Sequence, residues 1–158
     1  MRRPWNRISL PVYSVSCNNG NETNMHICTY VSAISMDPKL YMVALFKGSK
    51  TLDIVSNSTQ FLLQLLTEEQ YRLVPLLGQQ SGHHIQKIEI LQSKDLLDKY
   101  NQFFYLKKAA AILELNIIDR KETGDHVVFI CSVLKFKNLN DSNILTTEFL
   151  RLKKIIRA

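Results

Sequence analysis

Cysteine, glycine and proline are all scarce in this sequence, with 3, 5 and 4 residues among 158. The three cysteines, Cys17, Cys28 and Cys131, form no closely spaced pair, so no disulfide framework is indicated. With 22% charged residues and so little glycine and proline, a long disordered tail is excluded. No segment reaches the roughly 18 apolar residues of a membrane-spanning helix, and no apolar run follows Arg2 and Arg3, as it would in a signal peptide.

The same absences predict where the protein works. An odd number of cysteines without a secretion signal indicates reduced thiols and a cytoplasmic location. The Asn-x-Ser/Thr sequons at Asn21, Asn57 and Asn140 are then interpreted as accidental. Because 46% of the residues are hydrophobic and no repeat or change in composition interrupts the chain, residues 1–158 are expected to form one soluble domain.

Familiar catalytic motifs are missing as well. The sequence has no Walker A loop, no Gly-x-Gly-x-x-Gly, no Gly-x-Ser-x-Gly, no Cys-x-x-Cys and no His-Glu-x-x-His. His83 and His84 are adjacent, and neighbouring residues of a strand face opposite sides, so we predict no metal site. A net charge of +6 is compatible with phosphate-bearing ligands, nucleic acid or anionic lipid, and it does not choose between them.

Alternating and apolar segments predict a mainly β protein. Strands are expected at residues 11–17, 25–35, 40–46, 60–66, 109–118 and 126–136. In the second of these, Met25 and Ile27 would share one face, and His26, Cys28 and Tyr30 would share the other.

Turn and helix signals separate these strands. Hairpin turns are expected at residues 18–21 and 123–125, and short helices at 51–55, 67–77 and 93–100, while the structure of the tail from 144 to 158 stays open. Thr67 and Gln70 fit a capping box at the start of the second helix. The order lacks the strand–helix–strand alternation of a parallel sheet. It therefore favours an antiparallel Greek-key barrel with inserted helices.

The turn from Lys47 to Thr51 combines hydroxyl and ammonium groups with the expected start of a helix. Free backbone N–H groups and the positive end of a helix dipole attract anions, and phosphate is the natural ligand. The simpler interpretation is that Ser49 or Thr51 caps the helix and that the lysines are solvated.

Four segments, in this order along the chain, resemble the flavin reductase-like, FMN-binding split-barrel family. They are residues 24–38, which begin with Asn24 and close with Ser-Met-Asp-Pro; residues 49–52; Gly78 to Gly82 with Lys87; and residues 124–129, which begin Gly-Asp-His. Each is weakly specific alone, but together they cover most of the chain.

The resemblance implies a split β-barrel that forms a homodimer with FMN between the subunits. Family members hold the flavin ring largely through backbone groups, at the positions of Ile27, Cys28, Thr29, Tyr30 and Val31 here. The FMN phosphate would lie at Lys47, Ser49, Lys50 and Thr51. NADH or NADPH would approach Ser81, Gly82, Lys87 and His126, with His126 positioning the reductant.

In such a protein the flavin carries the chemistry, so no catalytic side chain is expected. A hydride would pass from NAD(P)H to the flavin, and electrons would then leave to free flavin or to an acceptor protein. The alternatives are a flavin-binding electron carrier without NAD(P)H activity and, less favoured, a basic β-barrel that binds nucleic acid. The sequence shows no exposed strand with interleaved aromatic and basic residues, so neither a nucleic-acid nor a membrane partner is expected. Simpler roles stay open: packing for Tyr30, a small buried filler for Cys28, and a solvated charge for Lys87.

Overall fold

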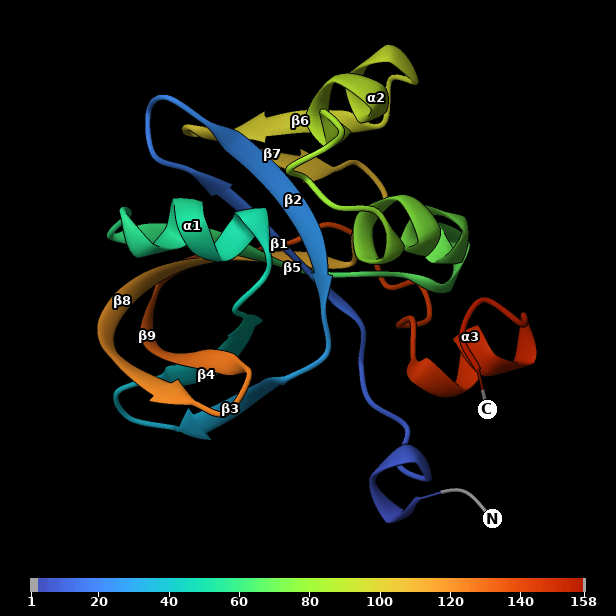
Figure 1. Cartoon of the computed structure of the whole chain (residues 1–158), viewed down its shortest axis with the longest axis horizontal. Helices are drawn as coiled ribbons and strands as arrows, with labels where there is room; N and C mark the ends of the chain where they lie inside the picture. Colours follow the sequence, from blue (N-terminus) through green and yellow to red (C-terminus); the bar gives the residue numbers. More distant parts are fainter. Residues whose placement is uncertain (1–2, 158) are drawn as a thin grey trace.

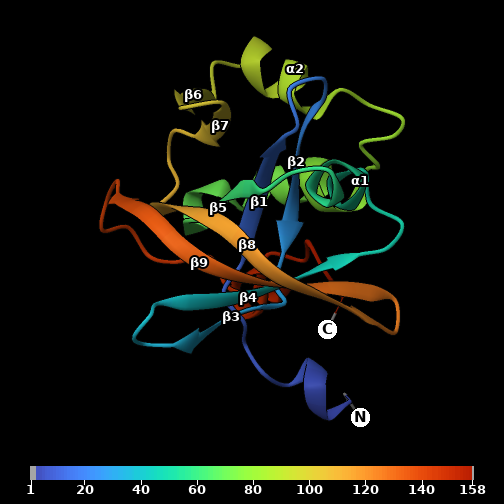
Figure 2. The same cartoon turned by 90° about the vertical axis from the view of Figure 1, so that its left-hand side faces the viewer.

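The computed structural model describes residues 3–157, so residues 1, 2 and 158 of the expected domain lie outside the described part. A seven-stranded antiparallel sheet with strand order β2-β1-β5-β8-β9-β4-β3 curls into a barrel (Figures 1 and 2). Its strands are β1 (Tyr13–Asn18), β2 (Thr23–Cys28), β3 (Val31–Ser35), β4 (Leu40–Phe46), β5 (Gln60–Leu65), β8 (Ala111–Thr123) and β9 (His126–Asn138). The predicted mainly β, antiparallel architecture is confirmed.

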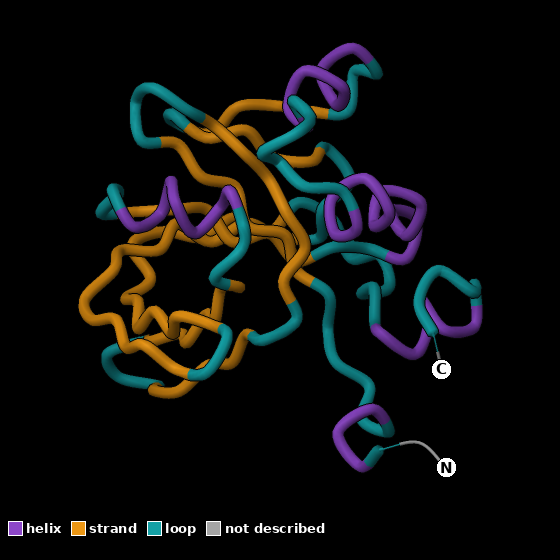
Figure 3. Tube along the Cα trace, in the orientation of Figure 1, coloured by secondary structure: helices purple, strands orange, loops and turns teal. Residues whose placement is uncertain are grey.

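Short helices lie in the segments that connect or flank the strands (Figure 3). They are η1 (Pro4–Asn6), α1 (Lys50–Ser56), η2 (Glu68–Leu73), η3 (Pro75–Gln79), α2 (Lys87–Ser93) and α3 (Thr147–Leu152). The predicted helix after Lys47 is therefore confirmed as α1, and the tail that the sequence left open contains α3. Within residues 3–157, no helix has the length and apolar character needed to cross a bilayer.

The strand predicted at 25–35 is wrong as a single element. It is broken at Thr29 and Tyr30 into β2 and β3, which occupy opposite ends of the strand order. The backbone N–H of Ala44 donates to the Tyr30 carbonyl (2.9 Å), so the connection itself is held against β4. Residue alternation continues through the break, and therefore periodicity could not reveal it.

Two predicted helices also differ from the structure. The helix predicted at 93–100 is wrong, because α2 ends at Ser93 and the chain reverses into the hairpin of β6 (Leu97–Tyr100) and β7 (Phe103–Leu106). Asp95 and Asn101 adopt positive φ values of 54° and 52°, which end the helix and turn the hairpin. The segment that Thr67 opens is a 3₁₀-helix, η2, followed by a π turn, η3, instead of one α-helix.

The buried residues form two main cores on the two sides of β2. The barrel core contains Cys28 and the buried face of α1, and it is completed by large side chains such as Phe61 and Phe129. The second core packs Met25 against Leu77 and other residues of η3, α2 and α3. Alternate residues of β2 thus face different cores, and its barrel-side residues lead to the pocket described next.

Candidate functional site

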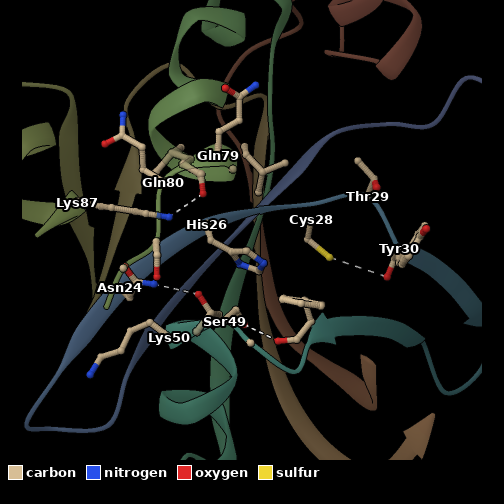
Figure 4. A pocket seen from close by; sticks show the side chains of 18 of the residues that line it. Asn24, His26, Cys28, Thr29, Tyr30, Ser49, Lys50, Gln79, Gln80 and Lys87 are labelled. Carbon is tan, nitrogen blue, oxygen red and sulfur yellow. Dashed lines mark hydrogen bonds between the residues drawn. The ribbon is translucent and has the colours of Figure 1, made fainter. Parts of the chain in front are cut away.

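A pocket of about 390 Å³ opens between the end of β2, the turn before α1 and the loop after η3. This volume lies within the range of small-molecule and cofactor sites, roughly 300–1,000 Å³. Its walls are formed by residues 24, 26–30, 44, 46, 48–51, 77–82, 87 and 126 (Figure 4). A second hollow, about 420 Å³, shares Thr29, Tyr30, Ala44 and His126 with it, so the two adjoin at the mouth.

The turn before α1 supplies one wall. Ser49 is the N-cap of the helix: its hydroxyl oxygen accepts a hydrogen bond from the Leu52 N–H (3.1 Å). The same hydroxyl donates to the Phe46 carbonyl (2.8 Å). Serine is favoured at this position because its side chain satisfies a backbone donor that the helix cannot. The turn is thereby fixed in place.

The two lysines of this turn have carboxylate partners. Lys47 forms an ion pair with Glu122 (2.7 Å), and Lys50 pairs with Glu22. Lys50 lines the pocket, whereas Lys47 does not. The sequence suggested that both ammonium groups converge on one anion, but the structure brings only Lys50 to the pocket wall.

The barrel-side face of β2 forms the floor. The Asn24 amide donates to the Thr51 hydroxyl (3.1 Å), which ties the strand to α1. Gly82 lies so close that a Cβ there would fall 2.7 Å from the Asn24 Nδ2 atom, which explains why glycine suits this position. Further along, the Cys28 thiol donates to the Ala44 carbonyl (3.4 Å). Burial raises the pKa of Cys28 to about 12, so it remains a neutral thiol, unsuited to nucleophilic chemistry.

His26 lies between Asn24 and Cys28 on this floor, pointing into the pocket (Figure 4). Its Nδ1 atom is buried and has no hydrogen-bond partner among the described residues. Burial, with smaller contributions from the charges of Lys87 and His126, lowers the pKa of His26 to about 4. The imidazole is therefore neutral at physiological pH.

Lys87, the first residue of α2, also lines the pocket. Its side chain is buried, and its ammonium group donates to the Leu77 carbonyl (2.8 Å). Burial lowers the pKa of Lys87 to about 8. The alternative of a solvated surface lysine is wrong, because only 3% of the residue is exposed.

Three rings gather at the mouth. The His126 ring lies 5.1 Å from the Tyr30 ring and 5.8 Å from the Phe46 ring, centroid to centroid. Its Nδ1 atom contacts an oxygen of Asp125 (2.7 Å), and this hydrogen bond lowers the pKa of the Asp125 carboxyl. Tyr30 and Phe46 are each about half exposed. Hence Tyr30 is not a core residue, and its ring is free to contact a ligand or a second subunit.

Most of the site residues predicted from the sequence line this pocket. The structure brings together Ile27, Cys28, Thr29, Tyr30, Ser49, Lys50, Thr51, Ser81, Gly82, Lys87 and His126, and it leaves Lys47 and Val31 outside. Val31 instead lines the adjoining hollow. Asn24, His26 and Phe46 also line the pocket, and the sequence did not single them out as site residues. The strand alternation already grouped His26 with Cys28, but it could not say that this face borders a cavity.

The adjacent histidines, His83 and His84, lie at the surface. His83 contacts Asp53 (3.4 Å) at the surface, and His84 is exposed. Across residues 3–157, no group of three His, Cys, Asp or Glu side chains is arranged to hold a metal ion.

Comparison with known proteins places this geometry in context. The family model described as "Flavin reductase like domain" matches residues 5–150. An uncharacterized protein of Pyrococcus abyssi is 26% identical over 127 residues, which cover 78% of this chain and 71% of that protein.

Solved structures agree on the fold. The FMN-binding protein from Thermus thermophilus with bound 1-cyclohex-2-enone superposes with a TM-score of 0.76 at 19% identity, over 87% of this chain and 75% of that one. The NADH:FAD oxidoreductase SgcE6 of Streptomyces globisporus gives a TM-score of 0.81 at 18% identity, over 95% and 88% of the two chains. The predicted split-barrel fold is thus confirmed.

Proposed function

This chain belongs to the flavin reductase-like family, and from that premise we propose that it is an oxidoreductase that binds FMN in the pocket beside β2. The observation that carries the proposal is the convergence of four distant segments on one cavity: residues 24 and 26–30, 48–51, 78–82 and 126. These are the segments whose sequences resemble the family.

The residues present suit a flavin. The pocket has a polar floor, and aromatic and imidazole rings lie at its mouth. A buried nitrogen of His26 has no hydrogen-bond partner among the described residues, and a ligand could provide one. Among residues 3–157, no carboxylate side chain lines the pocket, so a phosphate-bearing ligand would meet no direct repulsion within the wall. Flavin rings combine a large apolar surface with a polar edge, and this wall offers both kinds of contact.

In this proposal, Cys28, Thr29 and Tyr30 face the flavin ring at the end of β2, where Thr29 and Tyr30 belong to neither β2 nor β3. Ser49, Lys50 and Thr51 hold the phosphate at the turn before α1, where backbone N–H groups add to the lysine charge. Lys47 is left out of this set, because it pairs with Glu122 outside the pocket wall. NADH or NADPH approaches from the mouth, near Ser81 and His126.

The flavin, when bound, supplies hydride and electron transfer. The protein's own residues bind and orient. The neutral Cys28 thiol fills space beside the ring site, and the Asp125 carboxylate fixes the orientation of the His126 imidazole. No side chain is required to act as a nucleophile or as a general base.

We also propose that the protein works as a homodimer. Tyr30 and Phe46 at the mouth are 54% and 49% exposed, and Ile34 and Met36 along and beyond β3 are 48% and 84% exposed. Tyr30 and Phe46 line the pocket itself, and exposed apolar side chains at a binding site are typical of a surface that a partner covers. A second copy seated on this side would close the mouth of the pocket over the flavin.

The test of the proposed function is anaerobic reduction. Purified protein loaded with FMN is expected to lose its visible flavin absorbance on addition of NADH or NADPH, and to regain it in air. Loading without bleaching would overturn the reductase activity and support an electron carrier. A protein that retains no FMN at all would contradict the proposal as a whole.

A further inference from the structure

One polar group of the pocket is left without a partner. The Nδ1 atom of His26 is buried, yet no protein atom of residues 3–157 hydrogen-bonds to it. Nine or more of ten buried polar groups in proteins do have such a partner. His26 as a residue is only partly buried and lines the pocket, so a molecule bound there contacts its imidazole ring.

A buried cation lines the same pocket. Lys87 has three ammonium protons and uses one in the bond to the Leu77 carbonyl. The ion pairs of residues 3–157 involve Lys47, Lys50, Lys107 and Lys108, but not Lys87. Lys50 also lines the pocket, so Lys87 is its one described lysine without a carboxylate partner.

The side chains of His26 and Lys87 line the same pocket. The charge of Lys87 contributes to the lowered pKa of His26, and Figure 4 shows both side chains at the wall of the same pocket. Both line the pocket, one from β2 and one from the start of α2. A neutral imidazole and an ammonium group together offer hydrogen-bond donors to an acceptor placed between them.

We propose that His26 and Lys87 bind the polar edge of the flavin ring, through an acceptor oxygen of the ring itself. This inference rests on the proposed function. A ring carbonyl suits the position better than the phosphate does, because burying a doubly charged group beside one desolvated cation costs more than burying a neutral oxygen. The phosphate has the more open turn at Ser49 available.

The test compares flavins with and without a phosphate. Dissociation constants of FMN and riboflavin are measured by flavin fluorescence for the natural protein, His26→Leu, His26→Asn and Lys87→Met. His26→Leu is expected to weaken both flavins about tenfold, the effect of one lost hydrogen bond. His26→Asn is expected to restore most of the affinity, because its amide nitrogen can stand near the position of Nδ1. His84→Leu, at an exposed position outside the pocket, should change neither value.

Lys87→Met is expected to weaken FMN and riboflavin by the same factor. It should also lower the midpoint potential of the bound flavin, because a nearby positive charge favours the more negatively charged reduced ring. A purely structural role would leave that potential unchanged. Thermal unfolding of each variant shows that it is folded.

Other outcomes separate the two proposals. If Lys87→Met weakens FMN alone, the lysine contacts the phosphate and the inference is overturned. Unchanged affinities in all His26 and Lys87 variants would overturn it too, while leaving the proposed function intact. If the natural protein binds neither flavin, the proposed function fails, and the inference fails with it.

Discussion

Replacing Phe129 with alanine is expected to lower the free energy of unfolding by about 3–5 kcal/mol, the usual cost of removing a large core aromatic side chain. Phe129 lies on β9 with 1% of its surface exposed. Its ring meets the Phe61 ring edge to face at 6.4 Å in the barrel core. Truncation removes this contact and leaves a cavity that the antiparallel ladders on both sides of β9 hold open.

The measurement is urea denaturation followed by circular dichroism. Phe136→Ala provides a matched control, since Phe136 lies on the same strand but is 70% exposed. It should change the free energy of unfolding by no more than about 0.5 kcal/mol. Equal effects of the two substitutions would show that the barrel interior is not packed as described.

Replacing Ser49 with aspartate is expected to weaken FMN binding roughly a hundredfold and to leave riboflavin binding unchanged. Aspartate is as good an N-cap as serine and keeps the hydrogen bond from the Leu52 N–H, so α1 should remain intact even though the bond to the Phe46 carbonyl is lost. Its charge, however, would stand at the proposed phosphate position. Two unit charges about 4 Å apart repel by about 4 kcal/mol near a protein surface. Salt screens part of this repulsion. A remaining repulsion of roughly 2.7 kcal/mol corresponds to a hundredfold increase in the dissociation constant of FMN.

Flavin titrations at fixed ionic strength provide the measurement. Ser56→Asp adds the same charge at the exposed far end of α1 and should have little effect on either flavin. The phosphate assignment would be wrong if Ser49→Asp weakened FMN and riboflavin equally, or if it left FMN binding unchanged.

The sequence predicted those parts of the fold that local signals determine. The turn around Gly20, the strand at 40–46 and the helix capped by Ser49 all have short-range causes, and the structure confirms them. The break at Thr29 and Tyr30 has a tertiary cause, because the segment changes partners from β1 to β4. No local pattern records such a change.

The candidate site also combines features that the sequence predicted with features that depend on the tertiary fold. Family resemblance pointed to Ser49, Lys50 and His126, and the fold brings these residues to one pocket. The diversion of Lys47 to Glu122 could not be predicted, because Glu122 comes from a strand far along the chain. The unpaired nitrogen of His26 is likewise a property of the assembled pocket. Charge and alternation identify candidates, while only the packed structure shows which groups remain available.

The central claim is that the pocket beside β2 is the flavin site. The most direct measurement is a crystal structure of the protein grown with saturating FMN. We expect flavin density with the phosphate at the turn of Ser49 to Thr51 and the ring beside Cys28 to Tyr30, within reach of His26. Flavin density on another surface, or an empty pocket in such crystals, would contradict it.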